Sequence, residues 1–354
     1  MDVLRGATIA GMIVVDDPGT WSAVYPPLLH AEWNGWTYTD TIFPFFLFLA
    51  GVSLALSLAR RSAQGETSSA LLRRLFARAG VLAALGLALN LAAFLAFRLE
   101  HWRVPGVLQR IAVCVLVAGA VLLAGGARAA AWSAAALLIG YAALLRIGSL
   151  DPAGNLPGRV DAAVFGVHTW RPGFDPEGLL STLPAIATTL LGALAGERLR
   201  SEASLGRKAA ELLVAGAAAV AAGLAWGRSL PINKSLWTSS YALLTAGLAS
   251  IALAACLVLV DTTSRTGWAA PFRWLGRNAI LAFTLSTLGA ILLIGIRIGG
   301  PDGRPRSLWR ALYATVFDRF ADPRLGSLLF ALAYLALWVA VCGLLYRRRI
   351  FLRV

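Results

Sequence analysis

The sequence alternates between long apolar runs and short breaks that are charged or rich in Pro and Gly. Ten of these runs are candidate transmembrane helices, since a helix crosses the hydrocarbon core with about 20 apolar residues. We place them near residues 3–17, 38–59, 75–97, 107–126, 130–149, 179–196, 208–227, 237–260, 276–297 and 325–346. The pattern therefore predicts an all-α, polytopic helical membrane protein with about ten transmembrane helices, in a single domain over residues 1–354.

Composition supports the membrane prediction and excludes two other classes. Charged residues make up 14% of the chain and hydrophobic residues 58%, whereas soluble domains carry about 25% charged residues. These values argue against a soluble globular enzyme, and the high hydrophobicity argues against disorder. The net charge of +14 would suit a nucleic-acid partner, but in a membrane protein it is expected from Lys and Arg at the cytoplasmic face. We predict no nucleic-acid partner.

The basic residues also predict how the chain is oriented, because Lys and Arg concentrate in short cytoplasmic connections. With the N-terminus inside, the inner side holds 18 of the 32 basic residues and the outer side holds 13, while Arg110 lies within a span. Acidic residues divide the other way, with 12 outside and 6 inside, so the net charge is +12 inside and +1 outside. We therefore predict that both termini face the cytoplasm.

The cysteines and the common catalytic motifs give no sign of a metal or nucleotide site. Cys114, Cys256 and Cys342 all fall inside apolar runs, without the spacing of metal ligands. The sequence contains no Walker loop, Rossmann fingerprint, HExxH or GxSxG. We predict no bound metal, and we interpret the cysteines as small apolar packing residues.

The predicted outer connections are the long ones, and they carry the candidate chemistry. They cover residues 17–37, 98–106, 150–178, 228–236 and 298–324, and they contain His30, His101 and His168. Binding and catalytic residues concentrate in such long loops. The densest polar cluster runs from residue 16 to residue 40 and joins the first two spans.

His30 is the candidate general base of this cluster, because histidine exchanges a proton near neutral pH. Asp16 and Asp40 are the candidate carboxylates that would orient its ring, and at their predicted depth a carboxylate usually faces a cavity or a partner. Trp33, Asn34 and Trp36 follow His30 and are candidate substrate-binding residues. A structural alternative exists for two of these assignments. Thr37-x-x-Asp40 also fits a helix N-terminus, and His30 could be a solvated loop histidine.

Further candidates precede or enter later spans. Asp175 and Glu177 could bind an acceptor, although Asp-Pro-Glu also fits the first turn of a helix. Lys234 could pair with an anion or a carboxylate. Gln109 and Arg110 lie in an otherwise apolar helix, where an arginine either marks a functional site or extends to the interface. Gly192-x-x-x-Gly196 predicts close packing between two helices.

Several of these runs together resemble one family, the transmembrane acetyltransferases that include heparan-α-glucosaminide N-acetyltransferase. The resemblance rests on these segments: Asp2-Val-Leu-Arg5-Gly6, Pro27-Leu-Leu-His30-Ala-Glu-Trp33-Asn34-Gly35-Trp36, Phe43-Pro44, Arg103-Val-Pro-Gly-Val-Leu-Gln109-Arg110, Asp175-Pro-Glu177-Gly, Asn233-Lys234-x-Leu-Trp237 and Gly276-Arg-Asn278. These segments span nearly the whole chain. From this resemblance we expect a bacterial homologue without the lumenal N-terminal domain of the animal enzyme.

The resemblance implies an acetyltransferase that takes acetyl-CoA from the cytosol and acetylates an amino sugar or glycan across the membrane. It implies that His30 is the catalytic histidine, and we expect Gln109, Arg110 and Asn278 to line a channel for the donor. Where the family usually has an amide, this chain has Asp16-Asp17, which could strengthen His30 as a base or alter the acceptor.

The expected partners are therefore acetyl-CoA, a sugar or glycan acceptor and membrane lipid, with a homodimer left open. The expected location is a bacterial inner membrane. Two rival hypotheses from other classes remain at this point. One is a transporter of sugar or lipid that performs no chemistry, and the other is a scaffold within an envelope-building complex.

Overall fold

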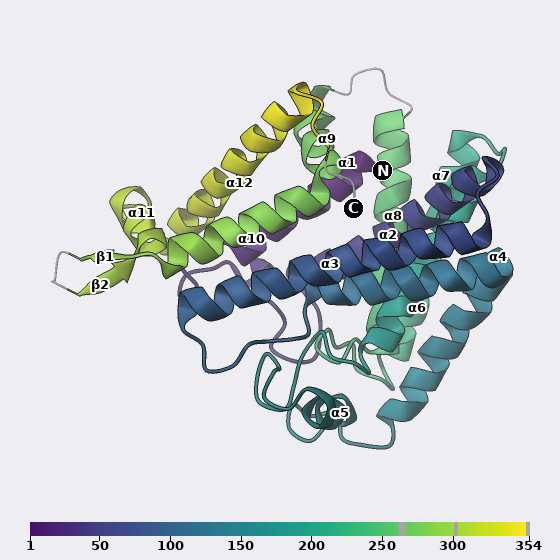
Figure 1. Ribbon diagram of the computed structural model, residues 1–354, viewed down its shortest axis with the longest axis horizontal. Coiled ribbons are helices and arrows are strands. Elements are labelled where there is room, and N and C mark those ends of the chain that lie inside the picture. The colour runs from purple at the N-terminus through teal and green to yellow at the C-terminus, as the bar shows by residue number, and fades with distance from the viewer. Residues whose placement is uncertain (262–266, 301–303, 352–354) are drawn as a thin grey trace.

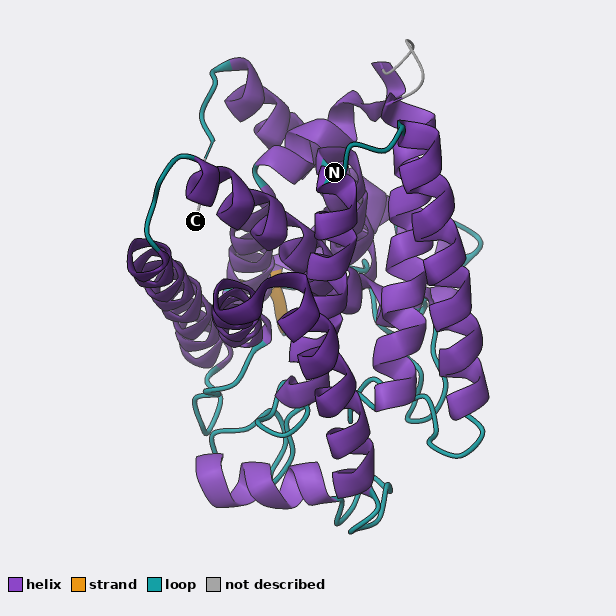
Figure 2. Ribbon diagram, turned by 90° about the vertical axis from the view of Figure 1, so that its right-hand side faces the viewer, coloured by secondary structure: helices purple, strands orange, loops and turns teal. Residues whose placement is uncertain are grey.

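The computed structural model describes residues 1–261, 267–300 and 304–351, and nearly all its regular structure is helical (Figures 1 and 2). The helices are α1 (Asp2–Asp16), α2 (Tyr38–Ala63), α3 (Ser68–Phe97), α4 (Val107–Leu145), α5 (Leu156–Phe165), α6 (Thr182–Arg200), α7 (Leu205–Trp226), α8 (Ser239–Cys256), α9 (Ala270–Arg277), α10 (Ala279–Gly295), α11 (Leu308–Val316) and α12 (Pro323–Arg347). Short helical turns are η1 (Pro26–Leu28), η2 (Leu257–Asp261) and η3 (Gly267–Ala269). The strands β1 (Arg297–Gly299) and β2 (Pro305–Ser307) pair antiparallel, with Arg297 opposite Ser307.

Each of the ten predicted runs falls on a helix or on half of one. Two runs share α4, which is broken by non-helical backbone at Gly125 and Gly126, the last two residues of the first run. By length and composition alone, six described helices could cross a membrane, or seven if the bent pair α9–α10 counts as one span. The structure thus agrees with an all-α polytopic membrane protein. The count of ten and the orientation stay predictions, and Arg265, Asp302 and Arg353, which entered the charge count, lie outside the described residues.

Helix α2 lies at the centre of the molecule and packs against α1, α4, α6 and α8. Its closest approach is to α6, where a Cβ at Gly192 would overlap the Phe48 carbonyl and one at Gly196 would meet the backbone of Val52. The predicted packing role of the Gly192-x-x-x-Gly196 motif is therefore confirmed. Small residues are what allow two helices to approach this closely without a hydrophobic driving force.

Helices α9, α10 and α12 form a second group that packs on α1 and includes the C-terminal part of the chain (Figure 1). Its core is aromatic: the Trp309 ring from α11 meets the rings of Phe330 and Tyr334 from α12 edge to face, at 4.8 and 5.2 Å. The carbonyl of Pro18 accepts a hydrogen bond from the Trp309 indole, which ties this group to the chain that follows α1.

The predicted outer connections contact one another, so they belong to the same end of the bundle. The backbone of Gly35 donates to Ile232, and the backbone of Val104 donates to His168. The Tyr25 hydroxyl donates to Asp322 at 2.8 Å. Three elements within these connections escaped the sequence prediction, namely α5 in 150–178 and the β1–β2 hairpin and α11 in 298–324. The clustering supports alternate crossing of the membrane by successive spans.

Candidate active site

His30 lies in the loop between α1 and α2 and is held by the first turn of α2. Its Nδ1 is 2.7 Å from Asp40 Oδ1. The other carboxylate oxygen of Asp40 accepts from the backbone N–H groups of Ala31 and Thr37, both at 3.0 Å. Thr37 and Asp40 form a capping box, so the structural and functional interpretations of Asp40 both apply. In the tautomer whose Nδ1–H donates to the carboxylate, the lone pair of the ring lies on Nε2.

A proline explains how the Asp40 backbone is fixed. Pro44 lies inside α2 and has no N–H, so the Asp40 carbonyl lacks its usual partner in the helix. The hydroxyl of Tyr241 in α8 donates to that carbonyl at 2.6 Å. In turn, the Tyr241 ring meets the buried Trp237 ring edge to face at 5.3 Å. The first turn of α2 is thereby anchored to α8 through a buried contact.

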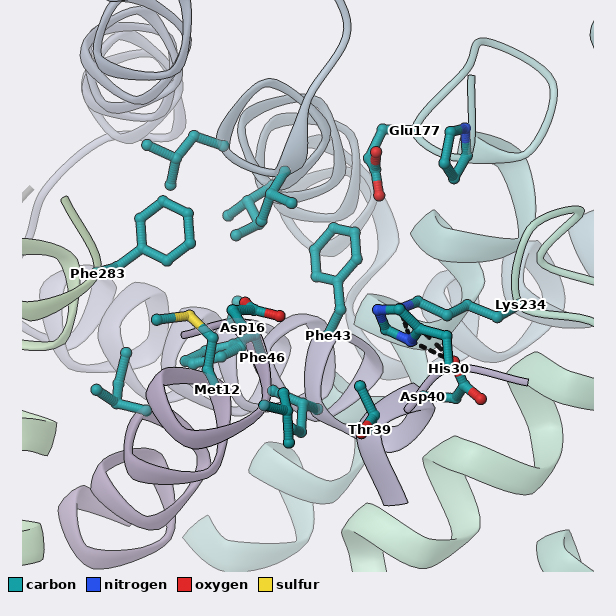
Figure 3. A pocket seen from close by; sticks show the side chains of 18 of the residues that line it. Met12, Asp16, His30, Thr39, Asp40, Phe43, Phe46, Glu177, Lys234 and Phe283 are labelled. Atoms are coloured by element: carbon teal, nitrogen blue, oxygen red, sulfur yellow. Dashed lines mark hydrogen bonds and ion pairs between the residues drawn. The ribbon is translucent and has the colours of Figure 1, made fainter. Parts of the chain in front are cut away.

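Lys234 reaches the same histidine from the turn before α8. Its ammonium nitrogen is 3.0 Å from His30 Nδ1, 3.3 Å from Nε2 and 3.7 Å from Asp40 Oδ1. The neighbouring Asn233 side chain donates to the Asn34 side chain at 3.2 Å, which connects this turn to the His30 loop. Figure 3 shows His30, Asp40 and Lys234 as one group at the wall of a cavity.

A second ionic group faces the same cavity from the turn that precedes α6. The Arg103 guanidinium donates to both oxygens of Asp175, at 2.6 and 2.8 Å, and also to Glu177. Asp175 is buried and also accepts from the backbone of Trp170 and Glu177, so it shapes the turn. It does not cap α6, which begins seven residues later, at Thr182. The sequence prediction of a helix start at Asp-Pro-Glu was therefore wrong.

The charges of this second group shift one another's pKa values. Burial alone would raise the pKa of the Glu177 carboxyl, but the charges of Arg103, Arg110 and Lys234 outweigh it and hold that pKa below its ordinary value. Burial would likewise lower the pKa of Arg103, and the two carboxylates outweigh it and raise that pKa. Glu177 therefore stays ionised at neutral pH, and its carboxylate is directed into the cavity (Figure 3).

Both groups line one cavity of about 1090 Å³ that extends from the loop end of the bundle to its other end. Asp40 and Ser57 both line it from α2, so at 1.5 Å per residue it extends about 25 Å along that helix. This length is close to the thickness of the hydrocarbon core, about 30 Å. Asp16, the last residue of α1, has an exposed side chain that faces this cavity. No hydrogen bond joins Asp16 to His30 among the described residues.

The far end of the cavity carries three arginines, Arg5, Arg78 and Arg277. Arg5 donates to Ser53 at 2.8 Å and to the carbonyl of Gly276 at 3.1 Å. Arg5 and Arg277 share one carboxylate, Asp2, at 3.3 Å each. Within the described parts of the chain, the buried Nε of Arg78 has no hydrogen-bond partner. This end therefore has an excess of positive charge and free donors, which suits a bound anion.

The structure separates the residues predicted from sequence into those that line the cavity and those that do not. The lining includes Asp16, His30, Trp33, Asp40, Glu177 and Lys234. The residues outside the lining are Asn34, Trp36, Gln109, Arg110, Asp175 and Asn278. Among the latter, Gln109, at the start of α4, donates to the Val104 carbonyl. Asn278, at the bend between α9 and α10, donates to the Ile350 carbonyl.

Arg110 lies behind the cavity wall, where it joins two of the turns described above. Its guanidinium donates to Ser181 at 2.5 Å and to the Gly178 carbonyl at 3.2 Å, and it lies 5.0 Å from the centre of the Trp237 ring. Trp237 ends the turn that carries Lys234, with its backbone donating to the Lys234 carbonyl. Arg110 thus connects the Glu177 turn with the Lys234 turn from a fully buried position.

Among the lining residues that sequence reasoning missed are five arginines: Arg5, Arg78, Arg103, Arg171 and Arg277. All five look like ordinary interfacial arginines, so their type carries no signal. A signal did exist in α2, where Ser53 and Ser57 interrupt an apolar run four residues apart. That spacing puts them on one face of the helix, together with Phe46, Leu49 and Ala50, and this is the face that lines the cavity.

Comparison with known proteins gives a consistent result. Residues 1–232 match the protein family described as “Heparan-alpha-glucosaminide N-acetyltransferase, catalytic”. Matching curated proteins include the heparan-alpha-glucosaminide N-acetyltransferase of Homo sapiens, 25% identical over 421 aligned residues, and that of Mus musculus, 24% identical over 421. The alignments cover 100% of this chain but only 59% of the human protein and 60% of the mouse protein. The chain spans about three fifths of the length of these relatives.

Proposed function

Since this chain belongs to the heparan-α-glucosaminide N-acetyltransferase catalytic family, we propose that it moves an acetyl group from cytosolic acetyl-CoA to an extracytoplasmic acceptor. The acceptor is an amino sugar or a glycan. The observation that carries this proposal is the single cavity with His30 near one end and three arginines at the other. A cavity of that length lets a donor enter from one side of the membrane and react at the opposite side.

The donor is proposed to lie along the cavity. Its phosphates bind Arg5, Arg78 and Arg277, because guanidinium groups form strong charge-assisted hydrogen bonds with phosphate. The apolar middle of the cavity accommodates the pantetheine arm, and the thioester reaches His30. Gln109, Arg110 and Asn278 support this path from behind the lining. No metal ion is needed for this chemistry.

Transfer to the acceptor uses His30 as the general base. As the acceptor nitrogen or oxygen attacks the thioester carbon, His30 Nε2 takes its proton, and Asp40 stabilises the imidazolium that forms. Lys234 lies where a cation can stabilise the oxyanion of the tetrahedral intermediate. The C–S bond then breaks, and the CoA thiolate receives the proton from His30. Every proton and electron pair is accounted for by these groups.

The acceptor is proposed to bind at the loop end, among charged and aromatic side chains. Asp16 and Glu177 offer carboxylates to an amine or hydroxyl, and the Trp33 ring offers an apolar face to a sugar. The Trp33 indole donates to the Leu150 carbonyl at 2.9 Å, which fixes the ring before an acceptor arrives. Asn34, Trp36 and Asp175 act indirectly, by shaping the loops that carry these residues.

Purified protein in lipid nanodiscs with labelled acetyl-CoA and a panel of amino sugars tests the proposal. We expect label on the acceptor with the unaltered protein, and a loss of about 10²–10⁴-fold in H30N. The matched control is H168N, since His168 lies in a loop at the same end but outside the cavity lining. Full acetyl transfer by H30N would contradict the assignment of His30 as the general base.

An alternative course passes through an acetyl-His30 intermediate, in which Nε2 attacks the thioester directly. Labelled acetyl-CoA without acceptor separates the two. The intermediate is supported if the labelled acetyl group stays on the protein while one equivalent of CoA is released per active site. A transporter without chemistry would instead carry acetyl-CoA or sugar across a vesicle membrane and leave the label on CoA.

We further propose that the protein lies in a bacterial inner membrane with both termini in the cytoplasm, since the basic excess lies on that side. Reporter fusions at the C-terminus test this orientation. Activity of a cytoplasmic reporter supports it, and activity of a reporter that works only outside the cytoplasm would reverse it. The proposed donor and acceptor sides would then have to exchange.

A further inference from the structure

The cavity poses a problem for a membrane that must hold ion gradients. It is continuous over about 25 Å along α2 and has charged groups near both ends. Water fills a polar passage of this kind, and a water-filled passage conducts protons and small ions. A stretch of apolar lining prevents this, because a narrow hydrophobic constriction expels water.

Three apolar side chains from three helices line the cavity between its charged ends. They are Met12 from α1, Phe46 from α2 and Phe283 from α10, and we call them the apolar collar. Figure 3 shows all three directed into the same part of the cavity, with Met12 and Phe46 next to each other and Phe283 facing them. The collar therefore surrounds the passage from several sides.

The positions of Met12 and Phe46 along their helices put these two residues at a similar depth. Met12 follows Arg5 by seven residues, and Phe46 precedes Ser53 by seven residues. Because Arg5 donates to Ser53, these two residues mark the same level of the cavity. Seven residues of α-helix rise about 10 Å, so Met12 and Phe46 lie about 10 Å from that level. Phe283 follows Arg277 at the same end by six residues, beyond the bend at Asn278.

The collar side chains differ in packing from the aromatic ring nearer to His30. Met12 is unbranched, with several rotatable bonds, and methionine adapts readily to irregular neighbours. Phe46 and Phe283 are half-buried, with the rest of each ring facing open space. By contrast, Phe43 nearer to His30 is buried and packed edge to face on Trp237 at 5.1 Å. The half-buried rings thus lie in the middle of the passage, and the buried ring of Phe43 lies beside the histidine.

We propose that the apolar collar is a permeability barrier that keeps the cavity impassable to water, protons and small ions when no other molecule fills it. This function is separate from acetyl transfer and does not rest on it. It requires only that the cavity connects the two faces of the membrane. An apolar chain can displace the collar side chains without exposing them to water, whereas a hydrated ion cannot.

Proton flux into proteoliposomes tests the barrier. The vesicles contain a pH-sensitive dye and carry a potassium diffusion potential that drives protons inward, with no acetyl-CoA present. We expect M12S/F46S/F283S to raise the flux about tenfold or more over the unaltered protein, because polar side chains let water through the constriction. F46W, which keeps the collar apolar, should leave the flux low.

The matched control is F76S, since Phe76 lies on α3 with 58% of its surface exposed and does not line the cavity. We expect its flux to equal that of the unaltered protein. A triple variant with unchanged elution and melting temperature, and flux no higher than that of F76S, overturns the barrier. If the triple variant does not fold, the three single serine variants decide. At least one should leak, and low flux in all three overturns the proposal.

Adding CoA to the leaking variant keeps this result distinct from the proposed enzyme function. If CoA lies along the cavity, CoA added on the side where the three arginines lie should reduce the proton leak. A leak that CoA does not change would count against the donor path. The barrier would still stand on the flux of the serine variants alone.

Discussion

The two ends of the cavity are built from similar residue types but are paired very differently. Near the loops, His30, Asp40 and Lys234 contact one another, and Arg103 is held by two carboxylates. At the other end, three arginines have only Asp2 as a carboxylate partner among the described residues, and one of them has an unused donor. Among these groups, those near the loops form complete ion pairs, whereas the three arginines at the other end have only one carboxylate between them.

This difference teaches what each end can do. A complete network holds its side chains in one geometry, which a proton-transfer step requires. An incomplete basic group gains its missing hydrogen bonds only when an anion arrives, so it favours binding. Pairing, more than residue type, separates the proposed reaction site from the proposed anchoring site.

The strongest way to break the complete end is D40N. The amide keeps the size of the side chain but cannot stabilise an imidazolium, so kcat for acetyl transfer should fall about 10²–10⁴-fold. Initial rates with labelled acetyl-CoA measure this. The control is D322N, since Asp322 also caps a helix but does not line the cavity. A kcat equal to that of the unaltered protein would contradict the assigned role of Asp40.

R103Q removes the cation of the second group at the same end. Two buried carboxylates lose their partner, so we expect unfolding to become easier by about 3 kcal/mol, the lower end for buried pairs since Arg103 is partly exposed. Thermal melting in detergent measures this loss. A variant as stable as the unaltered protein would show that the ionic group contributes nothing to stability.

The ion pair between Arg103 and Glu177 also predicts how the stability of the fold depends on pH. The Glu177 pKa is below its ordinary value in the folded protein, so the ionised pair stabilises the fold at neutral pH. That contribution should disappear as the pH falls below about 4.3, the usual pKa of glutamate, toward the folded-state value. In R103Q this part of the pH dependence should be smaller. An identical pH dependence of the melting temperature in both proteins would contradict it.

R78Q sharpens the contrast at the incomplete end. Loss of one charge-assisted contact to a phosphate should raise KM for acetyl-CoA about tenfold or more with little change in kcat. R74Q is the matched control on the same helix, because Arg74 is exposed and paired with Glu66. An unchanged KM in R78Q would exclude Arg78 from the donor site. A fall in kcat alone would move it to the reaction site.

The smallest expected effect is that of Y241F, behind the complete end. It leaves the Asp40 carbonyl without a partner in a helix already interrupted by Pro44, which should cost about 1–3 kcal/mol of stability. Equilibrium unfolding measures the loss, and a change well below 1 kcal/mol would show that water replaces the hydroxyl. Y141F is a useful control, since Tyr141 also donates to a carbonyl from a buried site but far from Asp40.

The sequence predicted the helices well because their signal is local. Apolar runs, the break at Gly125-Gly126 and the Gly192-x-x-x-Gly196 contact follow from residue type and spacing within a single segment. The helix α5 and the β1–β2 hairpin escaped prediction because polar loop sequences carry no comparable periodicity. The alternative interpretation of Asp-Pro-Glu as a helix start failed, and Asp175 instead contacts Arg103, a residue 72 positions away in the sequence.

The candidate site shows the same limit. His30 and Asp40 were predicted as partners because both belong to the polar cluster that joins the first two spans, and a contact within one short segment is local. The contact with Lys234 and the gathering of Arg5, Arg78 and Arg277 depend on tertiary packing. The predicted donor residues Gln109, Arg110 and Asn278 do not line the cavity, and each donates a hydrogen bond to a backbone carbonyl instead.

The carboxylate of Asp40 closes the start of α2 and also holds the histidine. Selection for higher stability and selection for faster proposed catalysis therefore act on the same two carboxylate oxygen atoms. Laboratory evolution should find few replacements at this position that improve either property alone. A redesign of the proposed chemistry would have to begin by giving α2 a new cap.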